Sequence, residues 1–328
     1  MPVSAGKKTA GALFGAVTFV VSVTVSLAIA EGVLRLKNTA MDNYDIEMWR
    51  YARELKVPSP NPLLGHEHKP SSSAVLQSVV IRINDWGLRG GPTGPPAAGK
   101  RRILFLGGSI TLGWGVKEEE TLTARIEKMF AEHGQTVEVL NAGIGNYNAP
   151  RYVERFLARL TVLQPTDIVA HYFLRDAEVL ERGGGNFLLR NSELAVMMWT
   201  LANRMFRPTG ETSLVGHYSA VYERTGPGFL AMTESLRRLS EYARQNHIRL
   251  YLAMVPDVHD LQQYPFRPVH DVMKGIAEQL GFIYVDLLPG FEGLSPQEVW
   301  AMPGDPHPNA LGHRRMAETL YPVLTRIP

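Results

Sequence analysis

Residues 101–116 read RRILFLGGSITLGWGV, an apolar run that ends in two glycines and Ser109. The apolar residues 103–106 predict a short buried strand, because no polar residue interrupts them. Glycine permits a sharp turn, so the serine would stand at the end of that strand. A helix that begins there would point amide donors and a partial positive charge at an anion formed next to Ser109. Seen alone, such a turn is more often structural than catalytic.

The alternation of strand and helix that begins at Arg101 continues almost to the end of the chain. Further apolar strands are predicted at 137–143, 167–174, 248–255 and 282–288, and helical segments at 122–130, 152–163, 229–246, 268–280 and 308–326. Apolar strands joined by helices predict an α/β fold with a parallel sheet covered on both faces. Ligands bind beyond the carboxyl ends of such strands, where Ser109, Asn141 and Asp176 can converge.

A second stretch, PGDPHPNALGH at 303–313, supplies what a nucleophilic serine needs. A hydroxyl is a poor nucleophile until a base removes its proton, and the base needs a third group to orient it. The Asp305 carboxylate could reach Nδ1 of His307 while Nε2 faces Ser109. The alternative is a proline-stiffened turn with a helix cap, although the same prolines would fix a loop that presents the imidazole.

Together the two stretches resemble the SGNH, or GDSL, hydrolase family over nearly all of residues 101–326. The family's ordered blocks are matched by FLGGSITLGWGV, NAGIGNYN and DPHPNALGH, which begin at residues 105, 141 and 305. The resemblance implies the flavodoxin-like three-layer α/β/α fold of SGNH hydrolases, with a parallel sheet of roughly five strands. It also implies Ser109 as nucleophile, His307 as its base and Asp305 as the residue that orients the base. Gly108 departs from the pattern, since many members carry Asp there.

The resemblance further indicates which groups would stabilise the oxyanion of an acyl-transfer reaction. The Ser109 amide is one donor, and a glycine amide of the second block is another, with the choice between two glycines left open. The candidate donors are Ser109, Gly143, Gly145, Asn146 and Arg175.

Arg175 marks a departure from the family. Members commonly carry Gly-x-Asn-Asp after the third strand, whereas this chain reads FLRD at 173–176, with Arg175 in the place of Asn. Loss of one oxyanion donor typically costs about 10²–10³ in rate. The guanidinium offers several donors and could substitute. It could equally turn away to pair with Asp176 or Glu178.

The beginning of the chain predicts a membrane anchor. Residues 9–30, TAGALFGAVTFVVSVTVSLAIA, carry no charge and as a helix would span about 33 Å, enough for a bilayer core of about 30 Å. The alternative is a secretory signal cleaved after Ala30, but the apolar run is longer than usual for one. A short N-terminal tail favours a single-pass protein of the inner (cytoplasmic) membrane, with a periplasmic or otherwise extracytoplasmic catalytic domain.

The chain is accordingly divided into five predicted parts. They are a tail at 1–8, a transmembrane anchor or uncleaved signal at 9–30, a linker with a short β extension at 31–100, and a hydrolase domain at 101–328 with an insertion at 177–215. Within the insertion, LAVMMWTLANRMF at 194–206 predicts a packed helix. A lid or acyl-binding role for Met197, Met198 and Trp199 is the alternative.

The composition argues against several kinds of partner. The formal net charge is +2, and removing Lys7 and Lys8 leaves the remainder neutral, so nothing electrostatic favours nucleic acid. The chain has no cysteine, which excludes disulfides and thiolate metal sites. His66-x-His68 predicts a solvated loop rather than half a metal site. Gly183-Gly184-Gly185 predicts a flexible loop, because no Lys-Ser/Thr helix start follows it. We expect no metal and no cofactor.

Three further segments, INDWGLRG, YPFRPVHDVM and DLLPGF, resemble membrane-anchored family members associated with bacterial exopolysaccharides. This predicts a serine ester hydrolase that removes O-acyl groups, chiefly acetyl, from a cell-surface or exported polysaccharide through an acyl-enzyme on Ser109. The alternative is a polysaccharide O-acetyltransferase with the same residues and a membrane-bound acyl-transfer or polysaccharide-export partner. Arg175 leaves open a third interpretation, a non-catalytic protein for glycan binding or assembly.

Overall fold

The computed structural model describes residues 5–41, 43–96, 99–180, 187–205, 213–303 and 307–326. The chain forms two compact units. The smaller comprises Met1–Arg50 and Gly185–Pro208, and the larger comprises Tyr51–Gly184 and Thr209–Pro328. Both catalytic blocks predicted from the sequence therefore belong to the larger unit.

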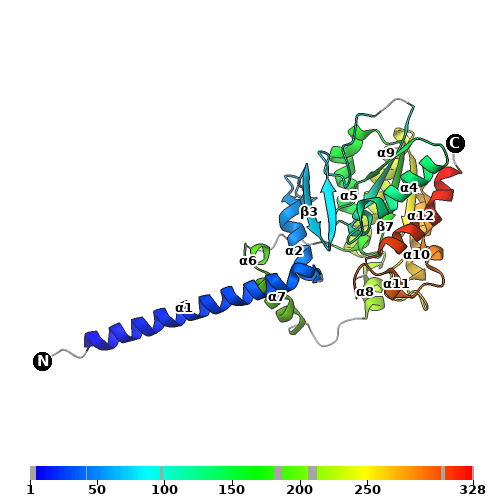
Figure 1. The fold of residues 1–328 in the computed structure, drawn as a ribbon. Coiled ribbons are helices and arrows are strands. Elements are labelled where there is room, and N and C mark those ends of the chain that lie inside the picture. The colour runs from blue at the N-terminus through cyan, green and yellow to red at the C-terminus, as the bar shows by residue number, and fades with distance from the viewer. Residues whose placement is uncertain are drawn as a thin grey trace. The chain divides into compact units, whose positions relative to one another are not determined.

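Five parallel strands form the centre of the larger unit (Figure 1). They are β5 (Arg101–Gly107), β6 (Val137–Asn141), β7 (Asp167–Tyr172), β8 (Arg249–Met254) and β9 (Ile283–Asp286). Their order, β6-β5-β7-β8-β9, is the flavodoxin-like arrangement in which the first strand lies between the second and the third. The register sets Phe105 opposite Asn141 and Gly107 opposite His171. The predicted fold class is confirmed.

Helices cover both faces of this sheet. One face packs against α5 (Ala149–Arg155), α9 (Pro227–Gln245) and α10 (Arg267–Gln279), and the other against α4 (Leu122–Glu132) and α12 (Ala310–Thr325). Along β5, Leu104 and Leu106 enter one core while Ile103 and Phe105 enter the other. Because successive side chains alternate between faces, a strand buried on both sides reads as a continuous apolar run.

Shorter elements connect these layers. They are the helices α3 (Ser109–Leu112), α8 (Leu214–Val221) and α11 (Pro296–Val299), a π-helical turn at Phe156–Leu160, and 3₁₀ turns at Glu118–Glu120, Thr161–Leu163, Leu174–Ala177 and Leu288–Phe291. Helix α3 and the turn Leu174–Ala177 directly follow β5 and β7, so they lie at the carboxyl ends of the strands.

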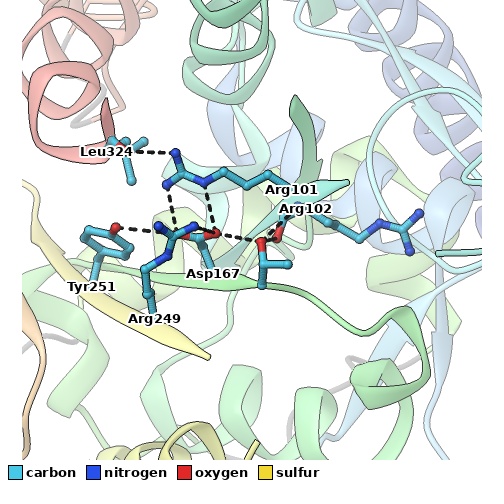
Figure 2. Close-up of polar contacts among 7 residues, drawn as sticks. Arg101, Arg102, Asp167, Arg249, Tyr251 and Leu324 are labelled. Atoms are coloured by element: carbon cyan, nitrogen blue, oxygen red, sulfur yellow. Dashed lines mark hydrogen bonds and ion pairs between the residues drawn. The ribbon is translucent and has the colours of Figure 1, made fainter. Parts of the chain in front are cut away.

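The amino ends of the strands hold a buried charge cluster (Figure 2). The carboxylate of Asp167, at the start of β7, is wholly buried and accepts two hydrogen bonds from Arg101, at 2.8 and 3.0 Å. It also contacts the Arg249 guanidinium at 2.9 Å and the Thr166 hydroxyl at 2.7 Å. Arg101 donates to the carbonyl of Leu324 as well, which ties α12 to the edge of the sheet. This cluster is a structural joint between strands and helix.

The segment before β5 is more ordered than the predicted linker. It contains two antiparallel hairpins, β1 (Lys56–Pro58) with β2 (His66–His68), and β3 (Ser72–Leu76) with β4 (Val79–Ile83). The second hairpin turns through Gln77 and Ser78, both with positive φ. Only a short β extension within a linker was predicted here. The additional order arises because Leu64 and Leu88 are buried in the core of the larger unit, a contact with residues far along the chain.

The smaller unit is helical. It contains α1 (Ala5–Lys37), a 3₁₀ turn at Asn38–Ala40, most of α2 (Tyr44–Leu55), α6 (Phe187–Asn191) and α7 (Glu193–Met205). Within Gly11–Ala40, an 18-residue window has a mean hydropathy of 2.3 and none of it is buried, so by length and composition this helix could cross a membrane or serve as a signal sequence.

The predicted insertion is divided between the two units. Its central residues 185–208, with helices α6 and α7, belong to the smaller unit, while its first and last residues belong to the larger one. Helix α7 confirms the predicted helical segment. One side of it is packed, since Val196 is only 2% exposed, whereas Met198 is 61% exposed and Trp199 47%. Gly183-Gly184-Gly185 lies outside the described residues.

Candidate active site

Ser109 stands at the first position of α3, directly after β5. The turn needs glycine at position 107, because a Cβ there would lie 2.0 Å from Thr111 Oγ1 and 2.9 Å from the carbonyl oxygen of His171. The side chain of Arg89, itself 5% exposed, donates to the carbonyls of Leu112 and Gly113 at 2.5 and 2.6 Å and so caps the far end of α3. The turn that carries Ser109 is therefore fixed both by its close packing at Gly107 and by Arg89 at the end of α3.

The sequence prediction that Ser109 meets the imidazole of the last loop agrees with the geometry. Ser109 Oγ lies 2.7 Å from His307 Nε2, although the two residues are 198 positions apart. His307 is 7% exposed. A hydroxyl at this distance from an imidazole is the arrangement that a nucleophile and its general base require.

Backbone contacts fix the loop that carries His307. Its carbonyl accepts from the amide of Ala301 at 2.8 Å, and the Asn309 amide donates to Val299 at 2.7 Å. The Asn309 side chain then caps α12 by accepting from the amides of Leu311 and Gly312. Asn309 is therefore a helix cap, as the alternative interpretation of this stretch, a proline-stiffened turn with a cap, predicted. The same loop also presents the imidazole of His307. Asp305, the predicted third member of the triad, lies outside the described residues.

The second block packs against α3, and two of its candidate amides already have acceptors within the fold. The Gly143 amide donates to Asn141 Oδ1 at 3.0 Å, and the Gly145 amide donates to the Tyr51 hydroxyl at 2.9 Å. A Cβ on Gly143 would lie 2.2 Å from the Leu112 amide nitrogen, so glycine is needed there for close packing against α3. Both glycines therefore have clear structural roles.

Asn146 differs from these glycines. Its backbone has a positive φ of 64°, and within the described part of the chain its amide has no acceptor. The next residue places its carbonyl 3.1 Å from where a Cβ of Gly108 would lie, so this loop reaches the residue before the nucleophile. The Ser109 amide also lacks an acceptor among the described residues. Among Gly143, Gly145 and Asn146, the candidate donors of the second block, only Asn146 has an amide without an acceptor among the described residues.

Side chains from the first hairpin hold the peptide that precedes Asn146. The Gly145 carbonyl contacts Lys56 Nζ at 2.7 Å and His66 Nε2 at 3.0 Å, while its amide bonds to Tyr51. Burial lowers the pKa of Lys56 to about 7, and burial together with the nearby lysine lowers the pKa of His66 to about 3. The imidazole of His66 is therefore neutral at pH 7.

The prediction of a solvated loop for His66-x-His68 is wrong. His68 is 2% exposed, and its two ring nitrogens contact the Tyr51 hydroxyl at 2.6 Å and the Gly87 carbonyl at 2.9 Å. Sequence reasoning missed Tyr51, Lys56 and Arg89 as parts of the site. The residues around each of them give no local sign of a role in the site, because the groups that they bind lie far along the chain.

Arg175 lies in the 3₁₀ turn after β7 and pairs with Glu178. The Nε–Oε2 distance is 3.1 Å, and the arginine side chain is about half exposed. This is one of the two outcomes that the sequence left open. The adjacent Asp176 is buried and accepts from the Phe173 amide, and burial raises its pKa to about 8. Asp176 thus closes the turn and is predominantly protonated at pH 7.

Two further buried histidines, His171 and His313, contact groups of the helices that follow β5. His171 Nδ1 contacts Thr111 Oγ1 at 2.9 Å, and burial lowers its pKa to about 3. His313, the last residue of the third block, accepts from the Leu122 amide at 3.0 Å and is fully buried. Both imidazoles therefore support α3 and α4 in the neutral state.

A model of the GDSL-like lipase/acylhydrolase family matches residues 105–315. Among solved structures, TesA aligns at 16% identity over 70% of this chain and 100% of its own, with a TM-score of 0.45. A catalytic mutant of Axe2, an acetylxylan esterase from Geobacillus stearothermophilus, aligns at 16% identity over 71% and 97%, with a TM-score of 0.47. A two-domain esterase active on acetylated mannans aligns at 18% identity over 69% and 49%, with a TM-score of 0.44. No curated protein sequence matches the chain.

Proposed function

The chain belongs to the GDSL-like lipase/acylhydrolase family, and we propose that it is a serine ester hydrolase that removes O-acyl groups from a polysaccharide. The observation that carries this proposal is the 2.7 Å contact between Ser109 Oγ and His307 Nε2 at the carboxyl ends of the strands. Ligands of open parallel sheets bind at this edge. The hydroxyl and imidazole therefore face the place where a substrate would enter.

The reaction follows from these groups. Ser109 Oγ attacks the ester carbonyl carbon while His307 Nε2 accepts the hydroxyl proton. The tetrahedral oxyanion accepts hydrogen bonds from the amides of Ser109 and Asn146. The carbon–oxygen bond to the sugar then breaks, His307 returns the proton to the leaving alkoxide, and an acyl-serine remains. Water then attacks the acyl carbon while His307 Nε2 accepts one of its protons. The bond between that carbon and Ser109 Oγ breaks, and the imidazolium returns the proton to Oγ, which releases the carboxylic acid and restores the serine. Asp305 would orient the imidazole from its Nδ1 side.

The proposed substrate is an O-acetylated cell-surface or exported polysaccharide. Three segments that resemble exopolysaccharide-associated family members support this, and two of them, INDWGLRG and YPFRPVHDVM, contain residues that build the larger unit. Arg89, from the first segment, caps α3. His270, from the second, contacts the Tyr264 hydroxyl at 2.8 Å and Asp286 at 2.9 Å.

We also propose the setting of this reaction. Helix α1 would anchor the protein as a single span in the cytoplasmic membrane, with the catalytic unit on the extracytoplasmic side. The uncharged run and the hydropathy of Gly11–Ala40 support the anchor. Such a position would bring the enzyme close to a membrane-bound acyl-transfer or polysaccharide-export partner.

The test compares the full chain in detergent with two serine variants. Ser109→Ala removes the proposed nucleophile, whereas Ser235→Ala removes a buried hydroxyl of α9 that bonds to the Met232 carbonyl. We expect hydrolysis of 4-nitrophenyl acetate to fall by about 10⁴-fold or more in Ser109→Ala and to stay near wild type in Ser235→Ala. Equal rates in wild type and Ser109→Ala would overturn the proposal. Faster release of nitrophenol when an acceptor sugar is added, with acetyl found on that sugar, would identify transfer instead of hydrolysis.

A further inference from the structure

The smaller unit exposes an apolar stripe that the proposed reaction does not use. The stripe lies on α7 and consists of residues spaced three and four apart, which places them on one face of the helix. It comprises Leu194, Met197, Met198, Leu201 and Met205. Met198 is 61% exposed, Leu201 58% and Met205 70%. An exposed contiguous apolar face of this kind marks an interaction surface.

A single carboxylate fastens α7 to α1. Glu31 accepts hydrogen bonds from the amides of Glu193 and Leu194 at 3.1 and 3.0 Å and from the Ser192 hydroxyl at 2.8 Å. It thereby satisfies the first amide donors of α7, which have no partner within the helix. Arg35 reinforces this joint, because it pairs with Glu31 at 2.7 Å and donates to the Asn191 carbonyl at 2.8 Å. The start of α7 is therefore held beside the C-terminal end of α1 (Figure 1).

An apolar groove of about 610 Å³ lies between the two helices. Its walls include Val33 and Leu34 of α1 and the stripe residues Leu194, Met197 and Leu201 of α7. On the other side of α7, Trp199 packs edge-on against Trp49 with ring centroids 6.4 Å apart. Tryptophan is enriched at the boundary between lipid and water.

We propose that α7 is a second membrane contact, with its stripe in the lipid at the bilayer surface and an acyl chain of a bilayer lipid in the α1–α7 groove. This rests on the proposed anchor and goes beyond the proposed reaction. Helix α1 has 33 residues and is about 50 Å long, whereas the hydrocarbon core is about 30 Å thick. The surplus must lie outside the core. The uncharged run ends at Ala30, so the charged end of α1 that begins at Glu31 would leave the hydrocarbon core. Glu31 is also the residue that binds the start of α7, so α7 would begin at the bilayer surface.

The position and composition of α7 together favour lipid as the occupant. The groove continues the apolar surface of α1 from Ala30 to Leu34, so the same lipids that surround the span would reach it. A helix that lies in the interface buries its apolar face about 5–10 Å below the headgroups. The methionine side chains of the stripe are flexible and suit a disordered acyl chain.

The absence of cysteine from the chain allows a direct test. Nitroxide labels are placed on single cysteines in the full chain by Met198→Cys, Asn203→Cys and Val20→Cys, and each protein is reconstituted in phosphatidylcholine vesicles. Asn203 is exposed on the same helix but lies about 140° further round it than Met198, so it is the matched control. Accessibility to oxygen, which concentrates in lipid, is compared with accessibility to a water-soluble nickel chelate.

We expect the oxygen-to-nickel ratio at Met198 to resemble that at Val20 and to exceed that at Asn203 several-fold. Equal nickel access at Met198 and Asn203, with Val20 protected, would overturn the inference while the anchor stands. Nickel access at Val20 would remove the anchor and the inference together. Dipolar broadening between Met198 labels would identify a second copy of the chain as the occupant, which also overturns it. Hydrolysis of 4-nitrophenyl acetate by the same preparations reports the proposed function separately.

Discussion

The two ends of the central sheet use polar groups in opposite ways. At the amino ends, both carboxylate oxygens of Asp167 are occupied by donors from Arg101, Arg249 and Thr166. At the carboxyl ends, the amides of Ser109 and Asn146 have no acceptor within the described chain. A cluster whose donors and acceptors all have partners can stabilise the fold and bind nothing else. A site with unmatched donors beside a nucleophile can bind an anion formed during a reaction.

The largest expected effect is a loss of kcat in variants at the carboxyl ends of the strands. We expect His307→Ala to lower kcat for 4-nitrophenyl acetate by about 10⁴-fold, and the double variant with Ser109→Ala to fall no further, because the two residues act as one unit. Steady-state kinetics of the single and double variants measure this. His217→Ala, which removes an exposed imidazole paired with Glu178, is the control and should stay near wild type. Additive losses in the double variant would contradict the proposed roles.

The next effect tests the amino end. Asp167→Asn leaves the two arginines beside it without their carboxylate, and we expect it to lower the free energy of unfolding by about 3–5 kcal/mol. The kcat of the folded variant should stay near wild type, because the cluster lies at the opposite end of the strands from Ser109. Urea unfolding and kinetics on the same sample measure both quantities.

A surface carboxylate provides the control for this variant. Glu234 pairs with Arg237 at 2.7 Å, and both side chains are about half exposed. Glu234→Gln should leave the free energy of unfolding close to that of the wild type, because water screens an exposed ion pair. A large loss of kcat in folded Asp167→Asn would show that the two ends of the sheet are not independent.

The smallest expected effect concerns the hydrogen bond that holds the peptide before Asn146, whose amide is a proposed oxyanion donor. Tyr51→Phe removes the hydroxyl that accepts from the Gly145 amide, so the following Asn146 amide is held less firmly. We expect kcat to fall by about 10-fold, a part of the 10²–10³ that removal of an oxyanion donor costs. KM should change little, since ground-state binding does not use this amide.

Tyr251→Phe is the matched control, because this tyrosine hydroxyl contacts Asp167 at the other end of the sheet. It should leave kcat unchanged. A rise in KM with constant kcat in Tyr51→Phe would instead indicate that the Tyr51 hydroxyl shapes the substrate site rather than holding the Asn146 amide in position.

Much of the site was predictable because it depends on local patterns. Ser109 follows an apolar strand and two glycines, and His307 lies in a proline-rich loop before an amphipathic helix. Both patterns are short, and each indicates the end of an element where a side chain can be presented. The parallel sheet then brings such ends to one edge, which is why two residues 198 positions apart could be paired from the sequence.

The supports of the site could not be predicted in the same way. Tyr51, Lys56 and His66 meet at the Gly145 peptide, and Arg89 reaches the end of α3. Each is a polar residue whose role depends on which backbone groups lie opposite, and that is decided by long-range packing. The segment that carries them was predicted to be mostly a linker for the same reason.

By itself, the sequence was enough to predict the fold class and the approach of Ser109 to His307, since strand burial, helical stripes and turn chemistry are local properties. The tertiary structure alone decided which amides of the second block stay unmatched, where Arg175 turns, and which apolar helix face stays uncovered. These features depend on which groups lie next to one another once all helices and strands have packed. An amide that already donates a hydrogen bond within the fold is not available to bind an oxyanion.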